Sequence, residues 1–394
     1  MLEKLFDRMD ELYPSLVEIR RHLHMHPELS HHEVETPKMV AQYLTDLGLE
    51  VKTGVGGRGV VGYLRGGKPG KTVALRADFD ALPIQDEKDV PYTSTVPGVM
   101  HACGHDLHTA TLLGVAKVLS EVKEDIAGTV VFVHQFAEEV TPGGAEMMIE
   151  DGCLEGVDVI YGAHVMSQDP IGTVNIIEGY ASSAQDDFKI EIFGKGGHGS
   201  SPHETVDALV TGSQLVVNLQ QIVSRRVSPL NAAAVTVASF HSGDGNNIIS
   251  DKAVLQGTVR TYDADERTKI EEALHLITRT TCEAANATYN IDYVRDCPSI
   301  FNDANEAKRV ETVATKIFGE EHVRRGDVMM GSEDFAYYQQ VVKGNYFIVG
   351  GGNPDLNAVY PHHHPMFDVD ERAIGHIGKI FIGTVFDFLN DPAH

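Results

Sequence analysis

The chain has 394 residues and a formal net charge of -25, and 42% of its residues are hydrophobic. This length is enough for two hydrophobic cores of ordinary size, so we expect a folded chain of two domains. The negative charge argues against nucleic acid or an anionic membrane surface as a partner.

The start of the sequence, "MLEKLFDRMDELYPSLVEIRRHL", alternates apolar and charged residues and lacks the apolar core of a signal peptide. No stretch of the sequence approaches the roughly 18 to 20 apolar residues of a membrane span. The four cysteines are too few for a disulfide framework in a chain of this length, which favours a reducing compartment. We therefore expect a cytoplasmic protein.

Helical and strand patterns alternate over the first 180 residues. The stretch "TPKMVAQYLTDLG" predicts a helix with Thr36 as N-cap, Pro37 at its first position and Gly48 at its end. A second helical pattern covers 107–122. The β-rich runs of this region are 60–64, 72–77, 128–135 and 157–164. The alternation predicts an α/β domain with a mostly parallel central sheet, in which ligands bind beyond the carboxyl ends of the strands.

The pattern changes at about residue 185. A strand, a helix over 204–226, two strands, a helix over 265–285 and a last strand follow in the order βαββαβ, which is typical of a ferredoxin-like unit. After Cys297 the α/β pattern returns, with a helix at 303–318, a strand at 345–351 and a helix at 370–389. We therefore predict one discontinuous domain, 1–184 and 297–394, interrupted by a second domain, 185–296.

Side chains of the types that bind metals occur in four separate segments. "MHACGHD" supplies Cys103 and His105, "VFVHQFAEE" supplies Glu138 and Glu139, "VIYGAHVM" supplies His164, and "YPHHHPMF" supplies three histidines, 362–364. Each segment alone is common in proteins without a metal. Together they contain about the donors of a two-metal centre, so we expect the fold to bring them together.

The adjacent glutamates indicate a division of roles. Neighbouring side chains at a strand end point in different directions, so one carboxylate can bind a metal while the other stays unbound. An unbound carboxylate beside activated water can accept a proton and later return it to a leaving amine.

The stretch "GKGGHGSSPH", residues 194–203, is a glycine-rich loop in the second predicted domain. Its glycines allow close approach of the backbone to a ligand, and His198 is its candidate functional side chain. The loop lacks the pattern of a phosphate-binding loop.

The motifs resemble, over nearly the entire chain, the di-metal aminoacylase and carboxypeptidase-like amidohydrolases. The branch that the sequence resembles most contains hippurate hydrolases, N-acyl amino acid hydrolases and auxin-conjugate hydrolases. The motifs occur in the family's order: "RRHLHMHPELSHHE", "RADFDALPI", "MHACGHD", "AEE", "GAHVM", "GGHGSSPH", "GTVRT", "GSEDF" and "HHPMFDVDE".

This resemblance implies that two divalent metal ions bind each subunit, with Cys103 between them and Glu138 as general acid and base. The implied metal ligands are Cys103, His105, Glu139, His164 and His363. Asp80 resembles the family's orienting carboxylate. The resemblance also implies that the second domain is a lid and dimerisation domain.

His198 resembles the lid-domain histidine that reaches the active site of the partner in family dimers, so we expect a homodimer or a multiple of one. Asn247 and Arg260 resemble positions that contact the substrate.

The motifs leave the last ligand and the identity of the metal open. His363 stands two residues before Pro365, as in the family pattern, but His362 and His364 are alternatives for the last ligand. Ser167 stands where many relatives have proline. The donor set suits zinc, and manganese is the alternative.

We therefore predict a metal-dependent amidohydrolase or peptidase that hydrolyses the amide bond of N-acyl amino acids or short peptides. The alternative is a catalytically inactive metal- or amino-acid-binding regulatory homologue.

Overall fold

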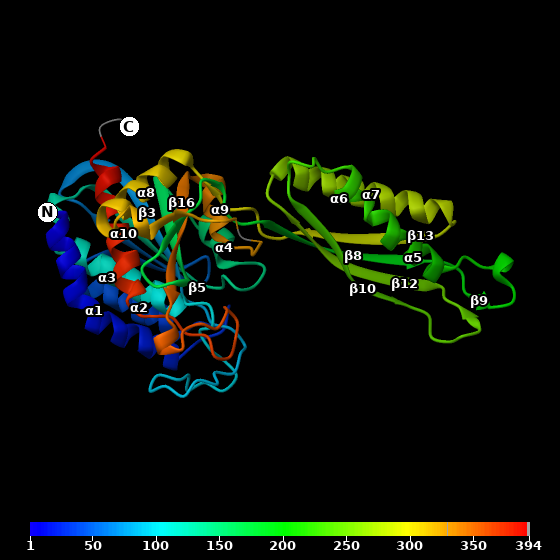
Figure 1. Cartoon of the computed structure of the whole chain (residues 1–394), viewed down its shortest axis with the longest axis horizontal. Helices are drawn as coiled ribbons and strands as arrows, with labels where there is room; N and C mark the ends of the chain where they lie inside the picture. The colour runs from blue at the N-terminus through cyan, green and yellow to red at the C-terminus, as the bar shows by residue number, and fades with distance from the viewer. Residues whose placement is uncertain (329, 392–394) are drawn as a thin grey trace. The chain divides into compact units, whose positions relative to one another are not determined.

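The computed structural model describes residues 1–328 and 330–391, and the chain forms two compact units (Figure 1). The first unit comprises Met1–Ala181, Phe301–Asp327 and Asp334–His394. Its last three residues, which are also the last three of the predicted segment 297–394, lie outside the described residues. The second unit comprises Ser182–Ile300 together with Val328–Glu333, a return of the chain that the sequence did not predict.

The first unit contains an eight-stranded sheet with the strand order β1-β2-β4-β3-β5-β16-β6-β15. Its strands are β1 Glu50–Val55, β2 Gly59–Arg65, β3 Lys68–Asp78, β4 Ala127–Gln135, β5 Val159–Pro170, β6 Val174–Ile176, β15 Val323–Arg325 and β16 Gly344–Gly352. The four central strands, β4, β3, β5 and β16, are parallel. β16 is buried throughout, as expected for a parallel strand that is covered on both faces. The predicted α/β class with a mostly parallel central sheet is confirmed.

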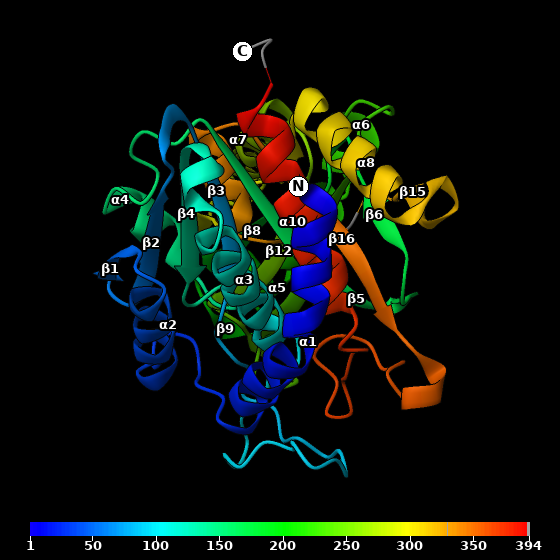
Figure 2. The same ribbon diagram turned by 90° about the vertical axis from the view of Figure 1, so that its left-hand side faces the viewer.

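Helices α1, α3 and α10 pack against one another and cover one face of this sheet (Figure 2). α3 is buried over almost its whole length, so its N-terminal end is held firmly between the sheet and the outer helices. The helices of the unit are α1 Leu2–Met25, α2 Glu35–Asp46, α3 His105–Ser120, α4 Gly144–Glu150, α8 Ala304–Phe318, α9 Phe335–Val341 and α10 Ala373–Leu389. The short elements are the strands β7 Gly179–Tyr180 and β14 Phe301–Asn302, and the 3-10 helices Lys123–Asp125, Glu320–His322 and Pro354–Leu356.

The N-terminus of α2 differs from the sequence-based prediction. Thr36 is not the N-cap, because the helix already begins at Glu35. The Glu28 carboxylate instead accepts the N–H groups of residues 34–36 at 2.9 to 3.0 Å. Gly48 follows the helix with a φ of 80°, as its predicted role at the helix end requires.

The second unit contains a four-stranded antiparallel sheet with the order β10-β12-β8-β13. Its main elements are β8 Ala184–Phe193, α5 Ala208–Leu219, α6 Gln221–Arg225, β10 Ala233–Ser242, β12 Lys252–Thr261, α7 Ala264–Ala284 and β13 Thr288–Arg295. This order along the chain and in the sheet is that of the predicted ferredoxin-like unit.

The single helix predicted over 204–226 is wrong in its start and its continuity. Pro202–Glu204 is a 3-10 turn, and α5 begins only after Asp207, whose carboxylate accepts the Val210 N–H at 3.0 Å. A two-stranded ladder of β9 Gly197–His198 and β11 Ile248–Ile249 completes the unit.

Residues 330 and 333 of the returning segment form hydrogen bonds inside the second unit. The Cys297 thiol donates to the Glu333 carbonyl at 3.2 Å, and the Ser183 hydroxyl donates to the Met330 carbonyl at 2.8 Å. Across the described parts of both units, no helix combines the length and the apolar character that crossing a membrane requires.

Candidate metal centre

The candidate donors of the first unit lie at the side of the sheet towards which the carboxyl ends of four adjacent parallel strands point, where ligands of such sheets bind. Asp80 follows β3, the two glutamates follow β4, and His164 lies in β5 beyond the last residue that pairs with β3. The histidines 362–364 follow β16. Cys103 and His105 lie at the N-terminal end of α3.

Gly104 shapes the turn between Cys103 and His105. Its φ of 96° is in the left-handed region that favours glycine, and a Cβ at this position would lie 2.5 Å from Val165 Cγ1. The Ala102 carbonyl, just before this turn, accepts the N–H of His363 at 2.8 Å. The backbone thus ties the turn to the histidine segment.

The Cys103 thiol faces His164. The distance from Cys103 Sγ to His164 Nε2 is 3.4 Å. The other ring nitrogen of His164, Nδ1, lies 2.6 Å from the Val165 carbonyl, to which it donates. This hydrogen bond fixes the tautomer and directs the Nε2 lone pair towards the sulfur.

Asp80 orients a second imidazole. One carboxylate oxygen accepts from His105 Nδ1 at 3.1 Å, and the other accepts from the Ser30 hydroxyl at 2.7 Å and the Glu139 N–H at 3.1 Å. In its neutral form, His105 therefore carries its proton on Nδ1 and has its lone pair on Nε2. This arrangement is the one that an orienting carboxylate beside a metal ligand needs.

The two glutamates approach the same ring atom. His105 Nε2 lies 3.9 Å from Glu139 Oε1 and 4.0 Å from Glu138 Oε2. The second oxygen of Glu139 lies 3.3 Å from His363 Nε2. Glu139 thus connects His105 with His363, and Glu138 lies beside them.

These side chains fit a divalent cation. The ligand atoms of Cys103, His105 and Glu139 lie within 4.8 Å of one another. His105 Nε2 and Glu139 Oε1 are both buried, and neither has a hydrogen-bond partner within residues 1–328 and 330–391. Unpaired buried polar atoms lower stability, and a bound cation would satisfy both of them.

The pKa values of the imidazoles and of the thiol are shifted in different directions. Burial and the neighbouring imidazoles hold the pKa of His164 well below its ordinary range, so this ring is neutral and its lone pair is available. Burial, with a contribution from Glu139, raises the pKa of the Cys103 thiol. Ionisation of this thiol therefore needs a nearby positive charge. Burial opposes protonation of His105, but Asp78 and Asp80 outweigh it and raise its pKa.

The buried pair Asp78 and His108 was not predicted from the sequence. His108 Nδ1 donates to Asp78 at 2.7 Å, and His108 Nε2 accepts the Val165 N–H at 3.0 Å. Both ring nitrogens of His108 are therefore occupied, and the pair braces the backbone beside His164. The available signal was an aspartate at the end of β3 and a histidine three residues after His105.

Of the three consecutive histidines, two face the cluster. His363 contacts Glu139, and its backbone has a φ of 64°, which is rare for a non-glycine residue. His362 Nδ1 lies 3.5 Å from Cys103 Sγ. His364 instead stacks on Tyr360 and accepts the Met366 N–H at 3.0 Å.

The other three predicted site residues belong to the second unit. His198 is exposed at the end of β9, where Nδ1 accepts the Ser200 N–H at 3.1 Å. The Asn247 carbonyl accepts the Gly199 N–H at 2.8 Å, so Asn247 lies next to the loop that carries His198. Arg260 lies in β12, where its guanidinium contacts Thr258 and the Val259 carbonyl.

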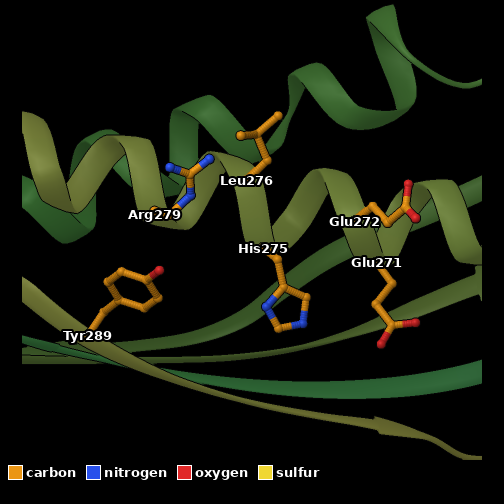
Figure 3. Close-up of a pocket in the computed structure, with 6 residues that line it drawn as sticks. All are labelled: Glu271, Glu272, His275, Leu276, Arg279 and Tyr289. Atoms are coloured by element: carbon orange, nitrogen blue, oxygen red, sulfur yellow. The ribbon is translucent and has the colours of Figure 1, made fainter.

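The second unit also has a surface pocket of about 460 Å³ between α7 and β13 (Figure 3). Its lining residues are Glu271, Glu272, His275, Leu276, Arg279 and Tyr289. They include none of the predicted site residues, and they lack a cluster of buried unpaired donors like the one at Cys103.

Comparison with known proteins identifies the family. The model of peptidase family M20/M25/M40 matches residues 74–382. The chain belongs to this family. Membership confirms the resemblance to the amidohydrolases and the predicted class, a metal-dependent hydrolase of amide or peptide bonds.

Two curated relatives and one solved structure illustrate the similarity. The chain is 40% identical to thermostable carboxypeptidase 2 of Saccharolobus solfataricus, over 95% of each chain. It is 43% identical to the N-acyl-L-amino acid amidohydrolase of Geobacillus stearothermophilus, over 74% of this chain and 79% of that one. The Bacillus subtilis YXEP protein, described as a dinuclear metal binding peptidase of family M20, is 31% identical. Its structure superimposes with a TM-score of 0.84 over 96% of this chain and 99% of that one.

Proposed function

We propose that this protein holds two divalent cations and hydrolyses the amide bond of N-acyl amino acids or short peptides. The observation that supports this most is the convergence of a thiol, imidazoles and carboxylates from four separate segments of the first unit. The relatives named as an N-acyl amino acid amidohydrolase and a carboxypeptidase support the substrate class, and the dinuclear YXEP protein supports the metal count.

The proposed ligands are Cys103, His105, Glu139, His164 and His363. Cys103 belongs to two groups of potential ligands, one with His164 and His362 and one with His105 and Glu139, which supports a role for Cys103 towards both cations. A thiolate together with imidazoles favours zinc, and manganese is the alternative.

Glu138 is the proposed general base and general acid. The cations, when bound, supply Lewis acidity for the substrate carbonyl and acidify a water molecule. Glu138 accepts the proton of the attacking water and then delivers it to the leaving nitrogen as the C–N bond breaks. Asp80 keeps His105 in the tautomer whose Nε2 is free to bind.

The second unit is proposed to contribute substrate contacts across a homodimer. His198 of one subunit would donate a hydrogen bond to the scissile carbonyl oxygen bound in the other, and Asn247 and Arg260 would bind the substrate. The hydrogen bond between the Gly199 N–H and the Asn247 carbonyl supports a shared role for these two segments. We also propose a cytoplasmic location, which the four free cysteines support.

The test of the function is metal analysis of the purified protein together with hydrolysis of N-acetyl amino acids, N-benzoyl amino acids and dipeptides. We expect turnover of at least one class, loss of turnover with a chelator, and recovery when zinc or manganese is returned. Metal binding without turnover of any substrate would support the alternative, an inactive binding homologue.

A Glu138→Gln variant tests the acid–base role and the dimer together. It should keep its metal content and lose nearly all turnover, because glutamine cannot accept and return the proton that the proposal assigns to Glu138. Mixing it with a His198→Ala variant, after dissociation and reassociation, should restore part of the activity, since a hybrid dimer then has one complete site. Activity retained by Glu138→Gln would remove this residue from the mechanism. A mixture that stays inactive would contradict the contribution of His198 across the dimer.

A further inference from the structure

His362 is fixed from two sides beside the proposed metal ligand Cys103. Its Nε2 lies 3.3 Å from the backbone nitrogen of Ser167, and its Nδ1 lies 3.5 Å from Cys103 Sγ. The ring packs against His164 and Phe367, with centroid distances of 5.1 and 4.7 Å. These contacts leave the imidazole little freedom to turn.

The backbone N–H of Ser167 decides the tautomer of this ring. An N–H can only donate, so Nε2 of His362 must accept and cannot carry a proton. The remaining ring proton is then on Nδ1, which faces the sulfur. The opposite tautomer would set two N–H groups against each other at 3.3 Å.

Ser167 is itself held in place. It is buried, and its hydroxyl donates to the Tyr360 carbonyl at 2.7 Å. The same residue therefore anchors the backbone just before His362 and orients the His362 ring.

We propose that His362 is not a metal ligand but a positioning residue that donates its Nδ1–H to the sulfur of Cys103. This inference rests on the proposed ligand role of Cys103. A hydrogen bond to a thiolate lowers the energy of the sulfur lone pairs and weakens their donation to a cation, so His362 tunes the ligand that both cations share. The same tautomer excludes His362 as a ligand through Nδ1 and leaves that role to His363.

The experiment uses the full-length protein loaded with Co²⁺, whose thiolate-to-metal charge-transfer absorption in the near ultraviolet reports the energy of the sulfur lone pairs. His362→Phe keeps a ring against Phe367 but has no donor, and His362→Leu is a smaller variant without a donor. Both should bind two Co²⁺ ions per chain, as the unmodified protein does, and both should shift the absorption to longer wavelength.

Two variants serve as matched controls. His362→Asn keeps an N–H donor at the position of Nδ1, so its absorption should stay closer to that of the unmodified protein. Ser167→Ala keeps the backbone N–H and loses only the hydroxyl, so its absorption should also change little.

Three results would overturn the inference. An unchanged absorption in His362→Phe and His362→Leu would show that no such hydrogen bond exists. Loss of a Co²⁺ ion in these variants would make His362 a ligand. Absence of the charge-transfer absorption from the unmodified protein would refute the ligand role of Cys103 as well, whereas the first two results leave the proposed function standing.

Discussion

Replacing Glu33 tests how the chain supports the segment that carries Glu138. Glu33 is completely buried, and its carboxylate accepts the Ala137 N–H at 2.9 Å. Ala137 has a φ of 47°, a backbone conformation that non-glycine residues rarely adopt, and it directly precedes Glu138. The second carboxylate oxygen of Glu33 lies 3.9 Å from Arg58 Nε. The hydrogen bond from the Ala137 N–H to Glu33 thus holds a strained turn at the proposed acid–base residue.

The size of the expected change in the free energy of unfolding follows from the burial of the Glu33 carboxyl. Burial raises the pKa of Glu33 from its ordinary value of 4.5 to about 7. Between these values the unfolded chain loses the proton and the folded chain keeps it, so stability falls as pH rises through this interval and is constant above it. The pKa difference corresponds to about 3 kcal/mol. Glu33→Gln keeps the oxygen acceptor and cannot ionise, so it removes this pH dependence.

The assay is urea unfolding followed by circular dichroism, because the chain has no tryptophan for fluorescence. From pH 4.5 to above pH 7, the free energy of unfolding of Glu33→Gln should rise relative to the unmodified protein by about 3 kcal/mol. Glu33→Ala leaves the Ala137 N–H unpaired, at a cost of about 1 to 3 kcal/mol, and should lower kcat more than Glu33→Gln does. If the difference in the free energy of unfolding between Glu33→Gln and the unmodified protein does not change with pH, Glu33 does not have a raised pKa in the folded chain.

Two further substitutions test the packing around the centre and the effect of a buried histidine. Gly104→Ala should reduce metal content, because the new Cβ would lie 2.5 Å from Val165 Cγ1. Gly98→Ala is the control for backbone strain alone, because Gly98 also has a positive φ but a Cβ there would have no atom within 4 Å. Equal metal content in the two variants would contradict the prediction. Burial lowers the pKa of His134 to about 3, so only the unfolded chain gains this proton as pH falls below 6.5. His134→Leu should therefore weaken the loss of stability in acid by up to about 1.4 kcal/mol per pH unit, and identical pH profiles in differential scanning fluorimetry would exclude this effect.

The sequence predicts the layers of the fold well because periodicity and helix-end signals are local. The βαββαβ order of the second unit and the alternation around the central sheet both follow from such patterns. The N-terminus of α2 does not, because its capping carboxylate comes from Glu28, seven residues before the helix begins. The separate return of Val328–Glu333 to the second unit also has no local signal.

Parts of the candidate site also have no local sequence signal. Sequence motifs select Cys103, His105 and Glu139, but the directions of three consecutive histidines depend on the unusual backbone of His363. The role of Asp78 and His108 depends on a contact with the Val165 N–H, which no spacing indicates. The tautomer of His362 likewise depends on a single backbone donor, the Ser167 N–H of β5.

The central claim is that five side chains hold two cations with Cys103 between them. The most direct measurement is a crystal structure of the metal-loaded protein with anomalous diffraction collected at the absorption edge of the metal. We expect two anomalous peaks per chain, with Cys103 Sγ bound to both and Glu139 and His363 bound to the same ion. A single peak, or peaks away from Cys103, would contradict it.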